Sequence, residues 1–586
     1  MGEKRHVRSP GLSRRDVVRD ALVLAAAGLT APFTGSVAAA ARFSKSPFKL
    51  GVASGDPLPD GVVLWTRLAL DLEDGVRWGL PESAYRLGWE VRDLEAPGAP
   101  VVRQGTAIAA ERNAYAVHVE VTGLRPGRSY GYRFTLGDHG DEGVTRTAPA
   151  PGDMPESLRF AFCSCAEYEN AFHYAYRFMA SEKPKPQFIV HLGDYIYEQT
   201  YDEYYQRDEG RGPKKEVPPG PSLPAREECP APDAKSPPRK RELQFDRVGK
   251  LRALSQYRRR YAEYKQDKHL QIAHKECPFI VTWDDHEVDN DYAGDRSAVS
   301  EEVDFLQRRS NAYRAYFENM PIRLSTLPVR GSGRRLYRHF DFGGLMRLYM
   351  LDERQYRSAQ ACPKSKLEGK GRLVALEGSC KSEIESVVDQ RGRRREMLGL
   401  EQERWLAAQL AGSKARWNVL AQGVMMAHVN TRADCKFNPI KKIAHASTDS
   451  WSGYIAARQR VVDLLDRHGA KNPVVLGGDV HCHLANKILK DWENPKSEPV
   501  APEFVCTAIS SYIRDMKYLT VKDSGNENTI VGIHDEHHGY VVCDVTKDEF
   551  QVSMVGVDAT SDTIGDKPVA VNRYRVRAGR HEPEKA

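Results

Sequence analysis

Residues 188–198 read FIVHLGDYIYE, and this stretch carries the pattern that decides the fold. A short apolar run, 188–192, stops at Gly193, and acidic and aromatic residues follow at once. Short apolar runs bounded by glycine are typical of buried strands. Runs of the same character occur at 158–163, 279–283, 417–421 and 473–476.

Helical patterns separate these apolar runs. They lie near 171–182, 246–274, 304–319, 401–410 and 455–468. Buried strands that alternate with amphipathic helices indicate an α/β layer architecture. Ligands of open α/β sheets bind beyond the carboxyl ends of the strands, so we expect the functional residues directly after the apolar runs.

The region before the first of these runs has a different pattern. Residues 48–147 read as short strands with frequent turn signals and no helical periodicity. The stretch 124–130, LRPGRSY, resembles the corner before the sixth strand of a fibronectin-type sandwich, where a tyrosine hydroxyl bonds back to the upstream backbone. We therefore predict a fibronectin/Ig-like β-sandwich domain over 41–150 and a catalytic domain over 151–586, with a proline-rich surface insertion at 205–243.

The first forty residues predict an export signal. A basic segment, 13–19, precedes an apolar stretch, 21–33, and three alanines at 38–40. This order is typical of a secretory signal, and the pair Arg14-Arg15 resembles a twin-arginine signal. We expect residues 1–40 to direct export by the twin-arginine machinery to the periplasm or the exterior. The alternative is a disordered basic tail followed by a core helix.

Composition excludes several classes of protein. The 586 residues contain 86 Lys and Arg against 80 Asp and Glu, a net charge of +6, which is too balanced for a dedicated nucleic-acid binder. No apolar run after the N-terminus is long enough to span a bilayer. Of the ten cysteines, six lie in or beside apolar runs and favour buried thiols or ligands. Cys362 and Cys380 are one candidate disulfide pair, but the sequence leaves the pairing open.

Four apolar runs deliver donor groups to the same sheet edge. They lead into CSC at 163–165, GDYIYE at 193–198, WDDHEVDND at 283–291 and GGDVHCH at 477–483. Taken singly, each favours a helix cap, a core aromatic, a buried thiol or a surface turn. Together they predict a metal centre with oxygen, imidazole and thiolate donors. A phenolate needs a strongly acidic metal, because tyrosine ionises only near pH 10, so Fe3+ beside Ca2+ or another divalent ion would satisfy the set.

These motifs resemble the phosphatase D branch of the calcineurin-like metallophosphoesterases. Four more stretches extend the resemblance over nearly the whole mature chain: GVASGDP at 51–57, LWTR at 64–67, DSWSGY at 449–454 and HGYVV at 538–542. We expect these four stretches to lie outside the metal centre. The resemblance implies an α/β/β/α sandwich core and alkaline phosphatase activity on phosphate monoesters, diesters or both.

The resemblance also implies roles for single residues. Asp194 would bridge the metals, and Fe3+ would be held by Cys165, Tyr197 and His481. Asp285 and Asp479 would face the Ca2+ site, and Asn290 is a further candidate ligand. His286 would contact the phosphate, which makes His286 and Asp194 the catalytic candidates. Gln422 stands where relatives carry a histidine, with His428 as a weaker candidate, and His483 either lines the pocket or packs.

We therefore expect a secreted, metal-dependent alkaline phosphatase or phosphodiesterase that acts in phosphate metabolism. A metal-activated oxygen nucleophile would attack phosphorus, and His286 would stabilise the developing charge or protonate the leaving oxygen. We expect a monomer with no nucleic-acid-binding module and no transmembrane segment after signal removal. The alternative is a secreted envelope-binding protein with a structural metal centre, although such centres are normally closed by Cys and His.

Overall fold

The computed structural model describes most of the chain. The described residues are 43–200, 240–246, 249–297, 304–326, 335–362, 373–375, 378–389, 391–429, 445–467, 471–494, 496–514, 516 and 529–586. The predicted signal, 1–40, and most of the predicted insertion, 205–243, lie outside them. None of the helices in the described part combines the length and the apolar character needed to cross a bilayer.

The N-terminal region is built only of strands and one short 3-10 turn. β3 (Ala84–Asp93), β4 (Val101–Ala110), β6 (Ser129–Leu136) and β7 (His139–Arg146) form a four-stranded antiparallel sheet. The remaining strands, β1 (Val52–Leu58), β2 (Gly61–Arg67) and β5 (Ala116–Thr122), continue a ten-stranded sheet instead. Both sets contribute side chains to one apolar cluster, among them Val62 of β2 and Leu87 of β3.

The predicted tyrosine corner is confirmed. The Tyr130 hydroxyl accepts a hydrogen bond from the Arg125 backbone N–H (2.8 Å) and donates one to the Arg125 carbonyl (3.1 Å). Thr147 adds a second tie, because its hydroxyl donates to the same carbonyl (2.7 Å). The corner therefore fixes the chain where it enters β6. The predicted boundary at residue 150 stays a prediction.

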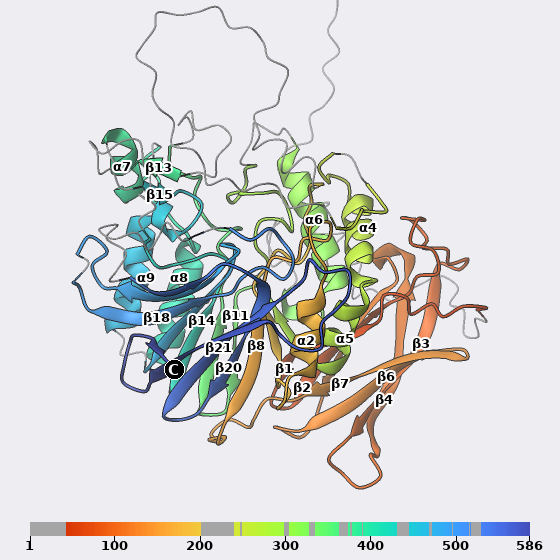
Figure 1. Ribbon diagram of the computed structural model, residues 1–586. Helices are drawn as coiled ribbons and strands as arrows, with labels where there is room; N and C mark the ends of the chain where they lie inside the picture. Colours follow the sequence, from red (N-terminus) through yellow and green to blue (C-terminus); the bar gives the residue numbers. More distant parts are fainter. Residues whose placement is uncertain are drawn as a thin grey trace, which may run out of the picture.

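Two large sheets form the centre of the molecule (Figure 1). The ten-stranded sheet has the order β23-β22-β21-β20-β8-β9-β10-β1-β2-β5, and the seven-stranded sheet has the order β11-β12-β14-β16-β18-β17-β19. The strands not yet bounded are β8 (Leu158–Cys163), β9 (Ile189–His191), β10 (Phe279–Val281), β11 (Arg338–Phe342), β12 (Met346–Met350), β14 (Trp417–Ala421), β16 (Pro473–Gly477), β17 (His483–Leu489), β18 (Pro499–Val505), β19 (Ile530–His534), β20 (His538–Val545), β21 (Glu549–Val557), β22 (Ala570–Arg577) and β23 (Glu584–Lys585). A separate two-stranded sheet pairs β13 (Leu373–Ala375) with β15 (His445–Ser447).

Alternation along the strands explains the layers. In β8, Phe160 and Phe162 belong to the apolar cluster between the two sheets, whereas Ala161 and Cys163 belong to the cluster under helices. Successive strand residues point to opposite faces, so an unbroken apolar run serves both clusters. In β14, Val419 and Leu420 divide in the same way.

Helices cover the outer faces of both sheets (Figure 1). α2 (Tyr174–Ser181), α4 (Leu254–Lys265), α5 (Lys268–Glu276) and α6 (Phe305–Asn319) pack on the ten-stranded sheet. α8 (Gly399–Ala411) and α9 (Ile455–Arg467) pack on the seven-stranded sheet, and α7 (Gly378–Glu385) lies beside α9. The predicted class, a mixed α/β protein with an N-terminal β region, is confirmed at this level.

The predicted helix over 246–274 is two helices. The carboxylate of Asp267 accepts hydrogen bonds from the backbone N–H groups of His269 (2.9 Å) and Leu270 (3.1 Å). An aspartate in this position caps a new helix, so α4 ends and α5 begins there. The apolar periodicity continues through the break, which is why it predicts one long element.

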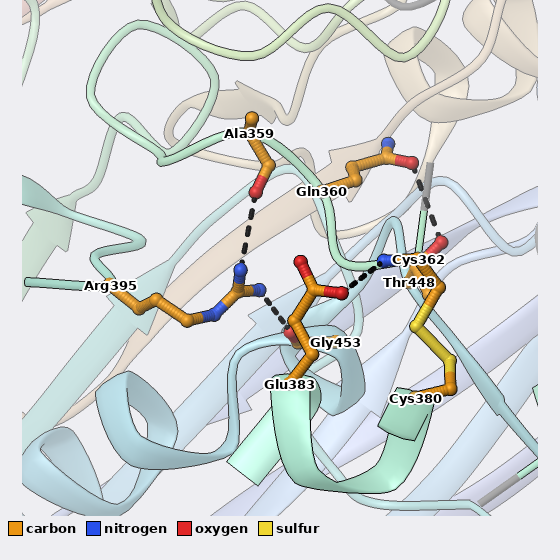
Figure 2. The surroundings of a disulfide bond; sticks show 8 residues. All are labelled: Ala359, Gln360, Cys362, Cys380, Glu383, Arg395, Thr448 and Gly453. Atoms are coloured by element: carbon orange, nitrogen blue, oxygen red, sulfur yellow. Dashed lines mark hydrogen bonds between the residues drawn. A yellow bond between two sulfur atoms is a disulfide. The ribbon is translucent and has the colours of Figure 1, made fainter. Parts of the chain in front are cut away.

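A disulfide joins Cys362 to Cys380, the candidate pair left open by the sequence. Figure 2 shows that the bridge sits between α7 and the segment that carries Ala359 and Gln360. The Cys362 backbone N–H also donates to Glu383 of α7 (3.2 Å), and Arg395 donates to the Ala359 carbonyl (3.5 Å). Cys163, Cys165, Cys277, Cys482, Cys506 and Cys543 are buried free thiols, as the sequence favoured.

Removal of this disulfide is expected to destabilise the protein. The bridge closes a loop with a sequence separation of 18 residues. Loop-closure entropy for a loop of that length is worth about 3 kcal/mol. The Cys362→Ser/Cys380→Ser double variant should therefore have a lower Tm than the wild type in calorimetry. A reductant should lower the wild-type Tm and leave the variant unchanged, whereas equal Tm values for both proteins would contradict the expectation.

Candidate metal centre

The carboxyl ends of parallel strands bring the candidate ligands to one edge. β8, β9 and β10 run parallel in one sheet, and β14 and β16 run parallel in the other. Cys165 follows β8, Asp194 follows β9 and Asp285 follows β10, while Asp479 and His481 follow β16. Both large sheets therefore contribute candidate ligands at this edge.

Backbone strain marks the same residues. Four candidate ligands have left-handed backbone conformations, with φ values of 62° at Cys165, 53° at Asp194, 66° at Asp479 and 61° at His481. Such conformations cost of order 1–3 kcal/mol each for residues other than glycine, and they cluster at functional sites. The strand ends thus turn sharply in order to aim these side chains.

Gly193 allows the closest approach of two strand ends. Its φ is 107°, a region that L side chains rarely adopt. A Cβ atom at this position would lie 2.4 Å from the backbone N of Asp284 and 2.7 Å from the carbonyl carbon of Trp283. Any side chain here would separate Asp194 from the loop after β10.

The carboxylate of Glu287 fastens these two loops together. It accepts hydrogen bonds from the backbone N–H groups of Asp194 (3.1 Å), Tyr195 (2.6 Å) and Asp284 (2.8 Å). Burial raises the pKa of Glu287 to about 7, and these hydrogen bonds oppose the rise. Glu287 therefore positions the backbone on both sides of the site.

The structure brings most of the predicted ligands together. Two groups of donor atoms are compact, because the atoms of each lie within 4.8 Å of one another. One group is formed by Cys165, Asp194 and His481, and the other by Asp194, Asp285 and His286. Asp194 belongs to both groups, as a bridging carboxylate would. The Tyr197 hydroxyl donates to Asp194 Oδ2 (3.2 Å) and lies 3.3 Å from His481 Nε2.

Asp479 and Asn290 lie at the margin of this arrangement. Asp479 Oδ1 is 3.8 Å from the Arg354 guanidinium, and its side chain is 24% exposed. The Asn290 backbone N–H donates to Glu198 (2.9 Å). Among the His, Cys, Asp and Glu residues of the described ranges, Asp479 belongs to none of the close donor groups.

Two residues at the centre, Arg354 and Asp449, are not among the site residues predicted from the sequence. Arg354 donates to Asp284 (2.9 Å) and to Asp449 (2.8 Å), and a third group joins donor atoms of Asp285, Asp291 and Asp449 within 4.8 Å. The motif at 449–454, expected outside the centre, therefore contributes Asp449 to it. The sequence does contain a signal for Arg354, because this residue lies just beyond the carboxyl end of the strand 346–350. That strand is not among the apolar runs from which the site was predicted.

His286 is held between an acid and an aromatic ring. Its Nδ1 lies 2.8 Å from Glu198 Oε2, and its ring stacks on Tyr197 with centroids 4.1 Å apart. Burial opposes the protonation of His286, but Asp194, Glu198 and Asp285 outweigh it and raise the pKa of the imidazole well above its ordinary value. Glu198 therefore orients the ring and, after Asp194, favours its protonated form.

The donor groups are poor anions when no cation is present. Burial raises the pKa of Asp194 well above its ordinary value, and Asp285 and Asp284 add to the effect. Burial likewise raises the pKa of the Cys165 thiol and of the Tyr197 phenol. The pKa of Asp479 rises to about 8, chiefly through burial and the charge of Asp284, while Arg354 and Arg514 act against the rise.

The residues that depart from the family pattern pack within the protein. Gln422 is fully buried, and its Oε1 accepts a hydrogen bond from the Trp451 indole (2.9 Å). His428 lies against Ser452 (3.2 Å) and Trp492. His483 accepts the Thr507 backbone N–H (3.1 Å), so it packs rather than lines the site.

Comparison with known proteins agrees with the resemblance seen in the motifs. The family model for the PhoD-like phosphatase matches residues 160–554, and the model for its N-terminal domain matches residues 35–149. Alkaline phosphatase D of Bacillus subtilis (strain 168) is 38% identical over 518 residues, which cover 88% of this chain and 78% of that protein. A solved structure of PhoD superposes with a TM-score of 0.75 at 35% identity and covers 93% of both chains.

The resemblance to this family is thus confirmed. The matched region includes all four strand ends that carry the candidate ligands. The protein is a phosphoric ester hydrolase, and it belongs to the PhoD-like phosphatase family.

Proposed function

We propose that the protein is a secreted, metal-dependent alkaline phosphatase and phosphodiesterase. The observation that carries the proposal is Asp194, which shares one donor group with Cys165 and His481 and another with Asp285 and His286. A carboxylate common to two ligand groups suits a site with two adjacent cations. Family membership favours this hydrolase over the envelope-binding alternative.

The buried polar atoms fit bound cations. Asp285 Oδ1 and His481 Nδ1 are buried and have no hydrogen-bond partner among the described residues. Asp194 has no lysine or arginine within salt-bridge distance in the described part of the chain, although it is 1% exposed. Buried charges of this kind are normally paired or bound to metals.

Donor chemistry supports the assignment of Fe3+ and Ca2+. Cys165, Tyr197 and His481 would hold the ferric ion with Asp194, because thiolate and imidazole suit a transition metal. Asp285, Asp479 and Asn290 would hold Ca2+, which prefers oxygen ligands. The cations would supply charge that neutralises phosphate oxygens and activates water. Other divalent ions remain compatible with the oxygen ligands.

The chain's own groups would handle the proton. Glu198 occupies Nδ1 of His286, so we assign Nε2 to the phosphate oxygen or the leaving oxygen. With a raised pKa, His286 holds a proton that it can donate as the ester bond breaks. Asp194 would place the phosphorus between the two cation sites.

Two finer points of architecture belong to the same proposal. The layers of helix, sheet, sheet and helix support an α/β/β/α metallophosphoesterase core, and the Tyr130 corner supports a fibronectin/Ig-like N-terminal domain. The boundaries 41–150 and 151–586, the monomeric state and the absence of a nucleic-acid-binding module are parts of the same proposal.

The Asp194→Asn variant should lose turnover of nitrophenyl phosphate. We expect a loss of more than about a hundredfold, because even outer-shell partners of metal ligands are worth 10–100-fold. Calcium should raise the Tm of chelated wild type but not that of the variant. Asp60→Asn, at an exposed turn between β1 and β2, is the matched control and should behave as wild type. Undiminished turnover of Asp194→Asn, or of the chelated enzyme, would overturn the proposal.

The Glu198→Gln variant should lower turnover by about 10–100-fold without loss of bound metal. Glu198 raises the pKa of His286, so its removal should lower that pKa. The alkaline limb of the pH–rate profile should then move to lower pH, because His286 loses its proton sooner. The exposed Glu73→Gln serves as control. A lower turnover at every pH, with the alkaline limb of the pH–rate profile at the same pH as in wild type, would show that Glu198 does not act through His286.

The export route rests on Arg14 and Arg15 alone. An Arg14→Lys/Arg15→Lys variant should remain in the cytoplasm with its first forty residues attached, whereas Arg19→Lys should be exported. Cell fractionation and N-terminal sequencing measure both. Normal export of the double variant would exclude the twin-arginine route.

A further inference from the structure

A chain of three buried side chains joins the two large sheets at Cys165. Cys165 Sγ donates a hydrogen bond to Ser164 Oγ (3.1 Å), and Ser164 Oγ lies 3.2 Å from Cys506 Sγ. Ser164 and Cys165 follow β8 of the ten-stranded sheet, whereas Cys506 follows β18 of the seven-stranded sheet. The proposed function uses Cys165 and leaves Ser164 and Cys506 without a role.

Contacts on two sides hold Ser164 in place. Ile509 N–H donates to the Ser164 carbonyl (2.9 Å), and Ser164 forms an isolated parallel bridge with Ala508. On the other side, a Cβ atom at Gly478 would lie 2.7 Å from Ser164 Oγ. The hydroxyl therefore packs directly against the turn that carries Asp479.

Cys506 is held from the opposite sheet. Its backbone N–H donates to the Gly477 carbonyl (3.0 Å), which continues the parallel pairing of β18 with β16. Its side chain is fully buried, and its thiol is free rather than bound in a disulfide. The Cys506 sulfur is therefore fixed beside the Ser164 hydroxyl by the strand that precedes it.

Coordination of a metal by Cys165 would set the direction of both hydrogen bonds. A cysteine ligand is a thiolate, which has no hydrogen and can only accept. The Ser164 hydroxyl has one hydrogen, and a charged sulfur is a stronger acceptor than a neutral thiol. Ser164 then donates to Cys165, and its oxygen can accept the S–H of Cys506.

A hydrogen bond to a metal-bound sulfur acts on the metal as well as on the sulfur. It stabilises the negative charge of the thiolate and fixes the direction in which the sulfur points. Hydrogen bonding around a coordinating sulfur also tunes the electronic properties of the metal. Ser164 and Cys165 are each 1% exposed, so bulk water is a poor substitute for the hydroxyl.

We propose that Ser164, supported by Cys506, is the positioning residue for the Cys165 thiolate. Its hydroxyl orients the sulfur toward the cation and stabilises the negative charge of the sulfur. The proposal rests on the proposed function, because it assumes that Cys165 binds a cation. Ser164 and Cys506 act through Cys165 and do not touch the substrate.

Substitution of Co2+ into the chelated protein tests this role without turnover. Co2+ bound to a thiolate absorbs light through charge transfer from sulfur to metal, and the absorption that is missing from Cys165→Ser belongs to that bond. In Ser164→Ala this absorption should move to longer wavelength, because a sulfur without its hydrogen bond gives up electrons more easily. The Co2+ affinity, measured by competition with a chelator, should fall about 10–100-fold.

Two variants of Cys506 separate hydrogen bonding from packing. Cys506→Ala removes the donor to Ser164, so the absorption should move to longer wavelength, by less than in Ser164→Ala. Cys506→Ser supplies a stronger donor than the thiol, so the absorption should move to shorter wavelength. Cys543→Ala, at another buried free thiol, is the matched control and should leave the absorption unchanged.

An unmoved absorption together with an unchanged Co2+ affinity in Ser164→Ala would overturn the role of Ser164. Shifts of the same sign in Cys506→Ala and Cys506→Ser would overturn the supporting role of Cys506, because packing would then decide. The two Cys506 variants also test the chain of hydrogen bonds if Ser164→Ala does not fold. A wild-type spectrum identical to that of Cys165→Ser would instead overturn the assignment of Cys165 as a ligand in the proposed function.

Discussion

Mutual repulsion among buried carboxylates is the constraint on which this structure depends. Asp194, Asp284, Asp285 and Asp449 converge at one sheet edge, and all are buried. Arg354 pairs with Asp284 and Asp449, which compensates part of that charge. Arg354 also lies 3.6 Å from Asp285, so the uncompensated charge falls chiefly on Asp194, whose pKa is raised by burial and further by Asp285 and Asp284. Such a cluster is costly unless cations neutralise it, so fold stability and metal binding are coupled.

The scaffold keeps this unfavourable cluster in place from several directions. Gly193 lets the loops after β9 and β10 touch, and Glu287 binds both through backbone N–H groups. The N-terminal strands support the same loops, because β1 pairs in parallel with β10. Asp56 at the end of that contact bonds to Arg338 (2.7 Å), and Trp65 donates to the Glu318 carbonyl (2.9 Å). The motifs at 51–57 and 64–67 therefore help to hold β10, the strand that leads into Asp285, in position.

The sequence predicted those residues of the site that directly follow an apolar run. Asp194, Asp285 and His481 follow short apolar runs that form neighbouring strands, so sheet geometry alone brings them to one edge. The tyrosine corner at Tyr130 is equally local, since the contact spans five residues. Asp449 and Arg354 were missed because their role depends on a pairing across 95 residues. The break at Asp267 was missed because a helix cap can interrupt a helix without any change in apolar periodicity.

The pairing of Cys362 with Cys380 shows the same limit, because spacing alone cannot select a partner. Gln422 stands where the resemblance leads one to expect a histidine, and its side chain accepts a hydrogen bond from the Trp451 indole. Both outcomes depend on three-dimensional neighbours that a single sequence does not specify. The sequence therefore predicts the chemical types of the donor groups, but it does not predict which residues they contact.

Elemental analysis of the folded protein by inductively coupled plasma mass spectrometry tests the central claim most directly. Catalytically active protein should contain iron and calcium in stoichiometric amounts, and turnover across preparations should rise in proportion to both. Full turnover in protein that contains neither iron nor any divalent cation would contradict the account, because the carboxylates around Asp194 would then be tolerated without neutralisation.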